Sequence, residues 1–356
     1  MTVNGILHRA PHAVNPCPDY DAVIVGDKAQ DSTRRVTLRD VARLAGVSHQ
    51  TVSRAINDKG EIDPETRRRV LEAARHLRYR PSRFARGLVR PGTITVGLIV
   101  PDVVNPFFPE LIAGVIDAAE QEGWQVLISS TQDRPGREPE LLRSLAGQVD
   151  ALIGYLFQSD DAIAAAVEGL PLVMMSRRAR DPGFGTVEID EQTGVRAAVR
   201  HLVARGHRRI AMLDCPAAEC PGRKAAFLAE VARNGPAVTG VAVVDVEQST
   251  AGGEDGFARL HADHPDFTAV FAFNDLVALG AYRAARGLGL AIPDDVALLG
   301  FDGLSLGELL DPPLTTVHVD KRRMGELAVA QARRLLAGEQ PEPDLLATAL
   351  LVRGSA

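Results

Sequence analysis

Two stretches of the chain after Ile94 alternate short apolar runs with segments whose apolar residues recur at helical spacing. The first predicts strands in ITVGLIV, QVLISS, DALIGYL and PLVMMS, and helices in PFFPELIAGVIDAAEQEGW, ELLRSLA and 161–168. The second predicts strands in RRIAMLD, VAVVDV, AVFAF, VALLGFD and TTVHVD, and helices in RKAAFLAEVARN, 253–263 and 275–286. Strands that alternate with helices favour parallel sheets covered by helices on both faces. We therefore expect an α/β protein with two Rossmann-like lobes.

A different pattern precedes these lobes, where residues 36–57 read VTLRDVARLAGVSHQTVSRAIN. Thr37 is placed to cap a first helix with Asp40 at capping-box spacing, and Ser48 can cap a second. Gly46 tolerates the positive φ needed where the first helix ends. The residues expected to pack the two helices together are Val41, Ala42, Ala45, Val47, Val52 and Ile56. This pattern predicts a helix-turn-helix.

A third helix is predicted to open at Asp63, with Pro64 in its first turn and a buried face that contains Val70 and Leu77. The following residues, 77–90, form a basic linker. Residues 36–90 hold 13 Lys+Arg against 6 Asp+Glu, whereas residues 91–356 hold 23 against 36. Only the small domain therefore has the charge to bind phosphates, although its arginines could also form an ordinary solvated face.

Length and composition exclude several classes of protein. A chain of 356 residues with 46% hydrophobic content can form about two or three domains with real cores. No apolar run is long enough to span a membrane, and we expect a cytoplasmic protein without a secretory signal. The three cysteines fit a reducing compartment, and the lone Cys215-x4-Cys220 pair does not indicate a zinc site. We find no motif of a nucleotide-binding or hydrolytic enzyme, so we expect no catalytic activity, cofactor or metal.

Residues 36–90 resemble the headpiece and hinge of the LacI/GalR family of bacterial transcription regulators. The similarity continues through NPFF at 105–108, HLVARGHRRIA at 201–211, FNDLVALG at 273–280, IPDDVALLGFD at 292–302 and PPLTTV at 312–317. The resemblance implies a periplasmic-binding-protein type 1 fold, in which the chain crosses between the lobes three times. It implies a headpiece over 36–82, a hinge over 83–92 and an effector-binding, dimerising domain over 93–356.

Residues 1–35 precede the family pattern. Their charge is balanced, with four basic against four acidic residues, and their apolar pieces are short. We expect a disordered extension, or a start codon assigned too early, and a regulatory tail remains an alternative.

The resemblance places the second helix in the major groove of DNA. Gln50 can then pair with adenine and Arg54 with guanine, while His49 holds another specificity position. Leu88 matches the hinge leucine that enters the minor groove, the alternative being a contact with a lobe. The full set of expected DNA contacts is Thr37, Leu38, Ser48, His49, Gln50, Thr51, Ser53, Arg54, Asn57, Tyr79, Arg83 and Leu88.

Small ligands of open α/β sheets bind at the carboxyl ends of the strands. The effector contacts expected there from the resemblance are Asn105, Phe107, Phe108, Ser176, Arg177, Arg223 and Asp275. Phe107 and Phe108 could instead anchor the core. Arg223 and Asp275 could pair with each other, or Asp275 could simply cap the helix that starts at Leu276. Ser176 stands where the family usually has Asp, so one negative charge is missing from the expected cleft while two adjacent cations, Arg177 and Arg178, remain. This suggests an anionic effector; the alternative is that both arginines face solvent.

These observations predict a transcription regulator, most simply a repressor, that binds a near-palindromic double-stranded operator as a homodimer. We expect a sugar or sugar derivative to control its operator affinity. The alternative is a sugar-binding protein without a DNA role, which should lack the helix-turn-helix. The sequence leaves open the identity of the effector, whether it induces or co-represses, and whether the protein is a dimer or a tetramer.

Overall fold

The computed structural model describes residues 38–56, 62–77, 93–167, 169–215, 221–340 and 342–356. The chain divides into two compact units, Met1–Pro91 and Gly92–Ala356. In the described residues, no helix is both long and apolar enough to cross a lipid bilayer.

The first unit contains three helices, α1 (Leu38–Ala45), α2 (His49–Ile56) and α3 (Pro64–His76). Their small shared core consists of Val41, Ala42, Val52, Ala55, Val70 and Ala73. Gly46 ends α1 with a φ of 65°, as its position in the sequence predicted. The predicted caps at Ser48 and Asp63 are also confirmed, since their side chains accept from the backbone N–H groups of Thr51 at 3.1 Å and Thr66 at 2.9 Å. The predicted Thr37 cap lies outside the described residues.

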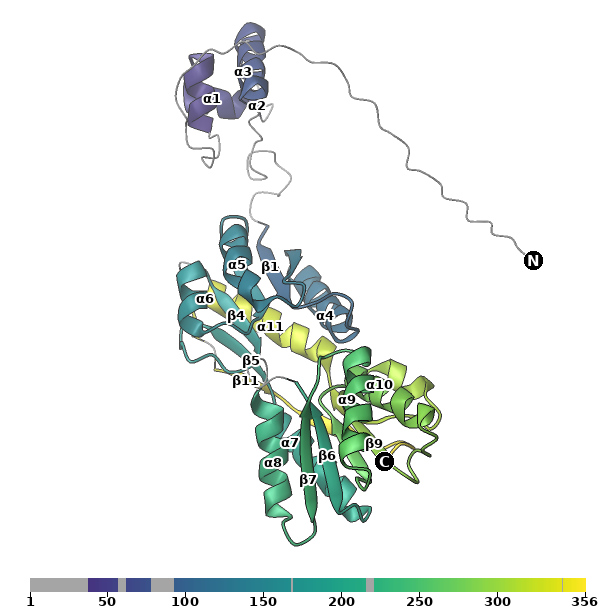
Figure 1. The fold of residues 1–356 in the computed structure, drawn as a ribbon. Coiled ribbons are helices and arrows are strands. Elements are labelled where there is room, and N and C mark those ends of the chain that lie inside the picture. The colour runs from purple at the N-terminus through teal and green to yellow at the C-terminus, as the bar shows by residue number, and fades with distance from the viewer. Residues whose placement is uncertain (1–37, 57–61, 78–92, 168, 216–220, 341) are drawn as a thin grey trace, which may run out of the picture. The chain divides into compact units, whose positions relative to one another are not determined.

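The second unit contains two six-stranded sheets, one in each lobe (Figure 1). The first has the order β11-β5-β4-β3-β1-β2 and is parallel throughout. Its strands are β1 (Thr95–Val100), β2 (Gln125–Ser130), β3 (Ala151–Tyr155), β4 (Leu172–Ser176), β5 (Gly185–Ile189) and β11 (Asp344–Leu346). Of the interior strands, β1, β3 and β4 are buried except at one end residue each of β1 and β4, which explains their continuous apolar sequences.

The second sheet has the order β12-β10-β9-β8-β6-β7. Its strands are β6 (Arg209–Asp214), β7 (Gly240–Asp245), β8 (Ala269–Ala272), β9 (Ala297–Asp302), β10 (Thr315–Val319) and β12 (Thr348–Leu351). The predicted strands pair in parallel, whereas β12, which the sequence did not predict, pairs antiparallel with β10. β12 follows β11 of the first sheet after a single residue, Ala347, so the chain enters the second sheet here without an intervening helix.

Helices cover both sheets. In the first lobe they are α4 (Phe107–Gln121), η2 (Pro135–Arg137), α5 (Glu138–Ala146), α6 (Asp160–Val167) and α11 (Lys321–Leu336). In the second lobe they are α7 (Glu191–Ala204), α8 (Pro221–Arg233), α9 (Thr250–Asp263), α10 (Asp275–Gly287) and η3 (Ser305–Leu309). Figure 1 shows α11, in yellow, against the lobe that contains β4, although it follows the strands of the other lobe in sequence.

The chain passes between the lobes three times, after β5, after β10 and after β11. This confirms the crossings implied by the family resemblance. The predicted strands and helices of both lobes are present. The spacing of apolar residues did not predict β5, α7, α11, β11 or β12, which include at least one of the two elements that flank each crossing.

The helices α4 and α11 pack so closely that each needs a glycine at the contact. A Cβ on Gly114 would overlap the backbone of Arg322, and one on Gly325 would lie 2.6 Å from the backbone nitrogen of Val115. Because α11 follows the second crossing, this contact fixes the crossing segment against α4, the helix that opens beside the cavity described next.

Candidate effector cavity and DNA-reading helix

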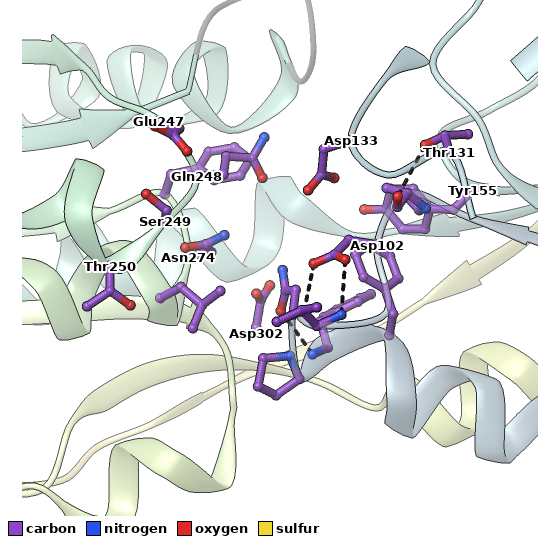
Figure 2. A pocket seen from close by; sticks show the side chains of 18 of the residues that line it. Asp102, Thr131, Asp133, Tyr155, Glu247, Gln248, Ser249, Thr250, Asn274 and Asp302 are labelled. Carbon is purple, nitrogen blue, oxygen red and sulfur yellow. Dashed lines mark hydrogen bonds between the residues drawn. The ribbon is translucent and has the colours of Figure 1, made fainter. Parts of the chain in front are cut away.

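A cavity of about 630 Å³ lies between the two lobes of the second unit. Both sheets contribute to its walls at the carboxyl ends of their strands, where ligands of open α/β sheets bind. Figure 2 shows Asp102, Thr131 and Tyr155 on one side, and Glu247, Gln248, Ser249 and Asn274 on the other.

Aromatic rings form much of the first lobe's wall. Phe107 and Phe108 open α4, and Tyr155 and Phe157 follow from the end of β3. Their rings meet edge to face, with centroids 5.3 Å apart for Phe107–Phe108 and for Phe108–Tyr155. Phe107 and Phe108 are 3% and 7% exposed, so they anchor the core and line the cavity at once. The two roles that the sequence left as alternatives are thus compatible.

Arg223 lines the cavity from α8 and is 4% exposed. Its Nε donates to Glu191 at 2.9 Å, and its Nη1 donates to the carbonyl of Phe273 at 2.6 Å. The guanidinium also lies over the rings of Phe273 and Phe301, 4.4 and 3.8 Å from their centroids. These contacts hold the planar group rigidly, which suits it to orient a ligand.

Asp302 is the most unusual carboxylate of the cavity. It ends β9 with a φ of 117°, a region rarely occupied by residues other than glycine, and it is 4% exposed. Its nearest cation is Arg223, 3.9 Å away, and its carboxylate accepts no hydrogen bond from the described part of the chain. Burial raises the pKa of Asp302 to about 7, with Asp275 and Glu191 adding to the rise and Arg223 and Lys321 opposing it. Figure 2 shows it beside Asn274 at the cavity.

Acidic groups outnumber basic ones among the described lining residues, which include Asp102, Asp133, Glu247 and Asp302 but one cation, Arg223. Asp102 uses both oxygens to accept from the backbone N–H groups of the turn before α4, including that of Asn105 at 2.8 Å. The side chain of Asn105 in turn accepts from Phe107 at 3.0 Å. The predicted contact Asn105 therefore lies at the cavity and also shapes the turn.

Asp275 does not line the cavity, in contrast to the sequence prediction. Its carboxylate is fully buried and accepts from the Leu304 N–H and from the Thr316 hydroxyl, both at 2.6 Å. The preceding residue, Asn274, lines the cavity and caps α10 through its Oδ1, which accepts from Val277 at 2.9 Å. The side-chain nitrogen of Asn274 donates to no acceptor among the described residues.

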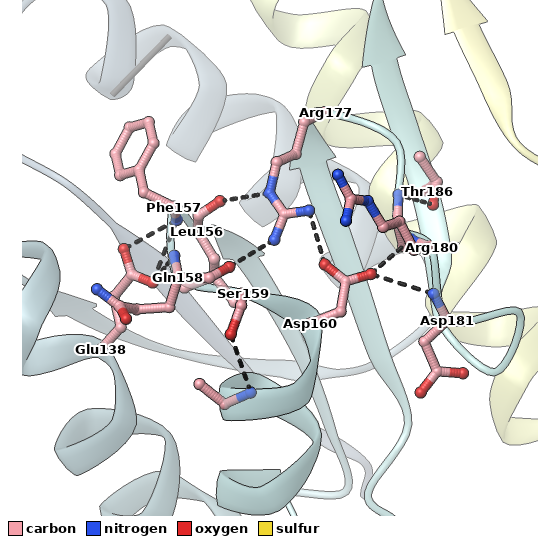
Figure 3. Close-up of polar contacts among 12 residues, drawn as sticks. Glu138, Leu156, Phe157, Gln158, Ser159, Asp160, Arg177, Arg180, Asp181 and Thr186 are labelled. Atoms are coloured by element: carbon pink, nitrogen blue, oxygen red, sulfur yellow. Dashed lines mark hydrogen bonds and ion pairs between the residues drawn. The ribbon is translucent and has the colours of Figure 1, made fainter. Parts of the chain in front are cut away.

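Ser176 and Arg177 also lie outside the cavity lining. Figure 3 shows why for Arg177: it donates to Asp160 at 2.7 Å and to the carbonyls of Leu156 and Gln158 at 3.2 and 2.6 Å. Arg178 is exposed and does not line the cavity either. The inference of an anionic effector from these two arginines is therefore corrected, because neither brings its charge to the cavity.

Arg177 and the fully buried Glu138 hold the same loop from opposite sides (Figure 3). The Glu138 carboxylate accepts from the backbone N–H groups of Phe157 and Gln158, both at 3.0 Å. Together these side chains satisfy the backbone groups that follow β3 and set the position of the Phe157 ring at the cavity. Burial raises the pKa of Glu138, and the two backbone donors and Arg177 partly offset this rise.

Sequence reasoning missed Tyr155, Phe157, Asn274 and Asp302 as cavity residues. Two of them had a signal, since Asn274 directly follows a predicted strand of the second lobe and Asp302 is the last residue of another. No local pattern marks the aromatic pair, because strand-end aromatics are equally common in cores.

In the first unit, α2 presents an exposed polar edge that contains His49, Gln50 and Arg54. Ser48 and Thr51 share a hydrogen bond of 2.9 Å at its start, and Ser53 is partly buried. The expected contacts Thr37, Asn57, Tyr79, Arg83 and Leu88, and the side chain of Leu38, lie outside the described residues.

Comparison with known proteins agrees with both sites. A model described as "Bacterial regulatory proteins, lacI family" matches residues 37–82, and one described as "Periplasmic binding protein-like domain" matches residues 199–356. The chain is 34% identical over 299 residues to the HTH-type transcriptional regulator DegA of Bacillus subtilis (strain 168), covering 82% of this chain and 88% of that protein. The chain belongs to the lacI family of bacterial regulatory proteins.

Solved structures of this family superpose on the chain. A LacI family transcriptional regulator from Arthrobacter sp. FB24 in complex with lactose has a TM-score of 0.68 at 31% identity, covering 74% of this chain and 100% of that one. The lac repressor dimer bound to operator and the anti-inducer ONPF has a TM-score of 0.70 at 28% identity, covering 90% and 99%. This lacI-family protein is a DNA-binding transcription regulator with a small-molecule effector site.

Proposed function

We propose that the protein is a repressor that binds a near-palindromic operator as a homodimer in the cytoplasm and that a neutral sugar or sugar derivative controls its operator affinity. The proposal involves binding alone, with no catalytic step. Residues 36–82 would read the DNA, 83–92 would form the hinge, and 93–356 would bind the effector.

The observation that carries the effector class is the buried Asp302 carboxylate, which faces the cavity and accepts no hydrogen bond from the described residues. Sugar hydroxyls are donors that would satisfy it, and the amide of Asn274 and the guanidinium of Arg223 would supply the complementary donors. The rings of Phe107, Phe108 and Tyr155 offer apolar faces for the carbon skeleton. The four lining carboxylates disfavour a phosphorylated ligand.

The DNA role rests on α2, whose exposed Gln50 and Arg54 can each recognise one base pair. The helix-turn-helix disfavours the alternative of a sugar-binding protein without a DNA role. The Arthrobacter regulator in complex with lactose and the lac repressor dimer on its operator support the two halves of the proposal.

The test is a calorimetric titration of the full chain with lactose, cellobiose and ribose, each beside its phosphorylated form. We expect at least one neutral sugar to bind and to change retention of an operator fragment, with its phosphate much weaker. Asp302→Asn should weaken sugar binding at least tenfold, whereas the control Glu308→Gln, at an exposed carboxylate outside the cavity, should not. Preferential binding of the phosphates would contradict the proposal.

A further inference from the structure

Lys321 is a buried lysine at the second crossing between the lobes. It is the first residue of α11 and is 1% exposed. Its ammonium donates to the carbonyl of Asp302 at 2.9 Å and to that of Gly303 at 3.3 Å. A third donation, to Val319 at 3.3 Å, joins the end of β10 to the same group. A charge removed from water at such cost needs several partners, and here most of them belong to one backbone corner.

That corner, Asp302–Gly303, has an unfavourable conformation. Asp302 has a φ of 117° and Gly303 a φ of 69°, so two successive residues leave the ordinary regions. A Cβ on Gly303 would also overlap the ring of His318. Such a corner persists only where its surroundings fix it, and the ammonium of Lys321 binds both of its carbonyls.

The corner belongs to the second lobe, and the same ammonium also contacts α4 of the first. It lies 3.4 Å from Oε2 of Glu110, in the first turn of α4, and 6.0 Å from the ring centroid of Phe107. Phe107 lines the cavity from the first lobe and Asp302 from the second. One cation therefore contacts the supports of cavity residues from both lobes.

We propose that Lys321 is a positioning residue that fixes the corner presenting Asp302 to the cavity and joins this corner to α4 of the other lobe. Its importance for effector binding rests on the proposed function, since that function assigns Asp302 to the effector. Its two structural consequences can be measured without any ligand.

The first measurement is hydrogen–deuterium exchange of the full chain. Lys321→Met should speed amide exchange in residues 301–305 at least tenfold, and Lys321→Arg should restore most of the protection. Arg322→Met is the matched control: Arg322 is the next residue, and its guanidinium pairs with Asp117 of α4 at 2.5 Å. Equal exchange at 301–305 in Lys321→Met and Arg322→Met would overturn the proposal.

The second measurement tests the link between lobes with a conservative change at a half-exposed site that should fold normally. Glu110→Gln should speed exchange in residues 301–305 severalfold, although Glu110 belongs to the other lobe. Asp117→Asn, on the same helix, should leave that segment unchanged. If Glu110→Gln speeds amide exchange only in residues 107–111, Lys321 does not link the corner to α4 and the proposal is wrong on this point.

The third measurement separates positioning from general stabilisation. Arg223, Asp275, Glu191 and Lys321 are the charged groups that act on Asp302, and loss of Lys321 should raise the pKa of that carboxyl further. The pH at which the unfolding midpoint falls should then be higher in Lys321→Met than in the wild type. In the Asp302→Asn background, Lys321→Met should no longer shift this pH. A difference that persists in the Asp302→Asn background would contradict the proposal. If these results hold while no sugar binds, only the proposed function fails.

Discussion

The Thr316 hydroxyl donates to the Asp275 carboxylate at 2.6 Å, a bond that joins β10 to the start of α10. The other carboxylate oxygen accepts from the Leu304 N–H, also at 2.6 Å. The arrangement requires a glycine at position 300, where a Cβ would overlap the carboxylate. Asp275 thus holds three segments of its own lobe together at the carboxyl end of the sheet. These contacts use its carboxylate and explain why it does not line the cavity.

Asp275→Ala should lower stability rather than remove an effector contact. The substitution leaves the buried N–H of Leu304 and hydroxyl of Thr316 without an acceptor, at a cost of about 2–4 kcal/mol. Urea unfolding of the full chain measures this. Thr316→Val, which removes one donor and keeps the shape, should cost less. A variant with unchanged stability that has lost sugar binding would contradict the structural role.

Stability should depend on pH through Asp302, whose pKa is raised to about 7. The folded protein holds a proton there that the unfolded chain has released, so this group's contribution is complete below its ordinary pKa of 3.8 and is lost as the pH rises through about 7. In the wild type this should lower the free energy of unfolding by about 1 kcal/mol between about pH 6 and pH 8, and Asp302→Asn should remove that decline.

Unfolding free energies of wild type and Asp302→Asn at several pH values test this difference. Asp275 and Asp214, with pKa values raised to about 6, provide the comparison. Their contributions should be lost mainly below the range assigned to Asp302. Parallel pH profiles for wild type and Asp302→Asn would show that Asp302 is already ionised at neutral pH.

Neighbouring arginines provide a matched pair. Arg177→Met removes the donors to Asp160, Leu156 and Gln158, and it should cost about 2–4 kcal/mol since it leaves a largely buried carboxylate without its cation. Arg178→Met, at an exposed position, should change stability by no more than about 0.5 kcal/mol. Sugar affinity should fall only in Arg177→Met, through the displaced Phe157. Loss of sugar binding at full stability would instead indicate direct contact by Arg177.

The headpiece and most strands were predictable because their signals are local. A cap such as Ser48, a positive-φ position such as Gly46 and a buried strand such as β1 each depend on a few adjacent residues. The crossing segments were not predictable in this way. β11 and β12 are short and take their partners from strands far away in sequence, and α11 packs on the lobe opposite to the strand it follows.

The cavity was only partly predictable for the same reason. Asn105, Phe107, Phe108 and Arg223 lie where the sequence placed them, since each sits near a strand end or matches a specific motif. Asn274 lines the cavity in place of the predicted Asp275, and this depends on which of the two adjacent side chains points toward the cavity. That direction is set by Thr316 and Leu304, which are distant in sequence, so no reading of FND alone could decide it.

Base recognition by α2 should separate from its stability. Arg54→Ala should relax the preference at one operator base pair by about 1–3 kcal/mol, and Gln50→Ala should do so at another, because each exposed side chain can make two hydrogen bonds to a base edge. Ser48→Ala removes the cap accepted by Thr51 and should cost about 1 kcal/mol of headpiece stability. Its operator preference should stay unchanged while affinity falls evenly across sequences.

Selection of bound fragments from a randomised palindrome, followed by retention assays for each variant, measures both effects. A uniform loss in Arg54→Ala, with every base preference intact, would make Arg54 a phosphate contact and assign sequence reading to other residues.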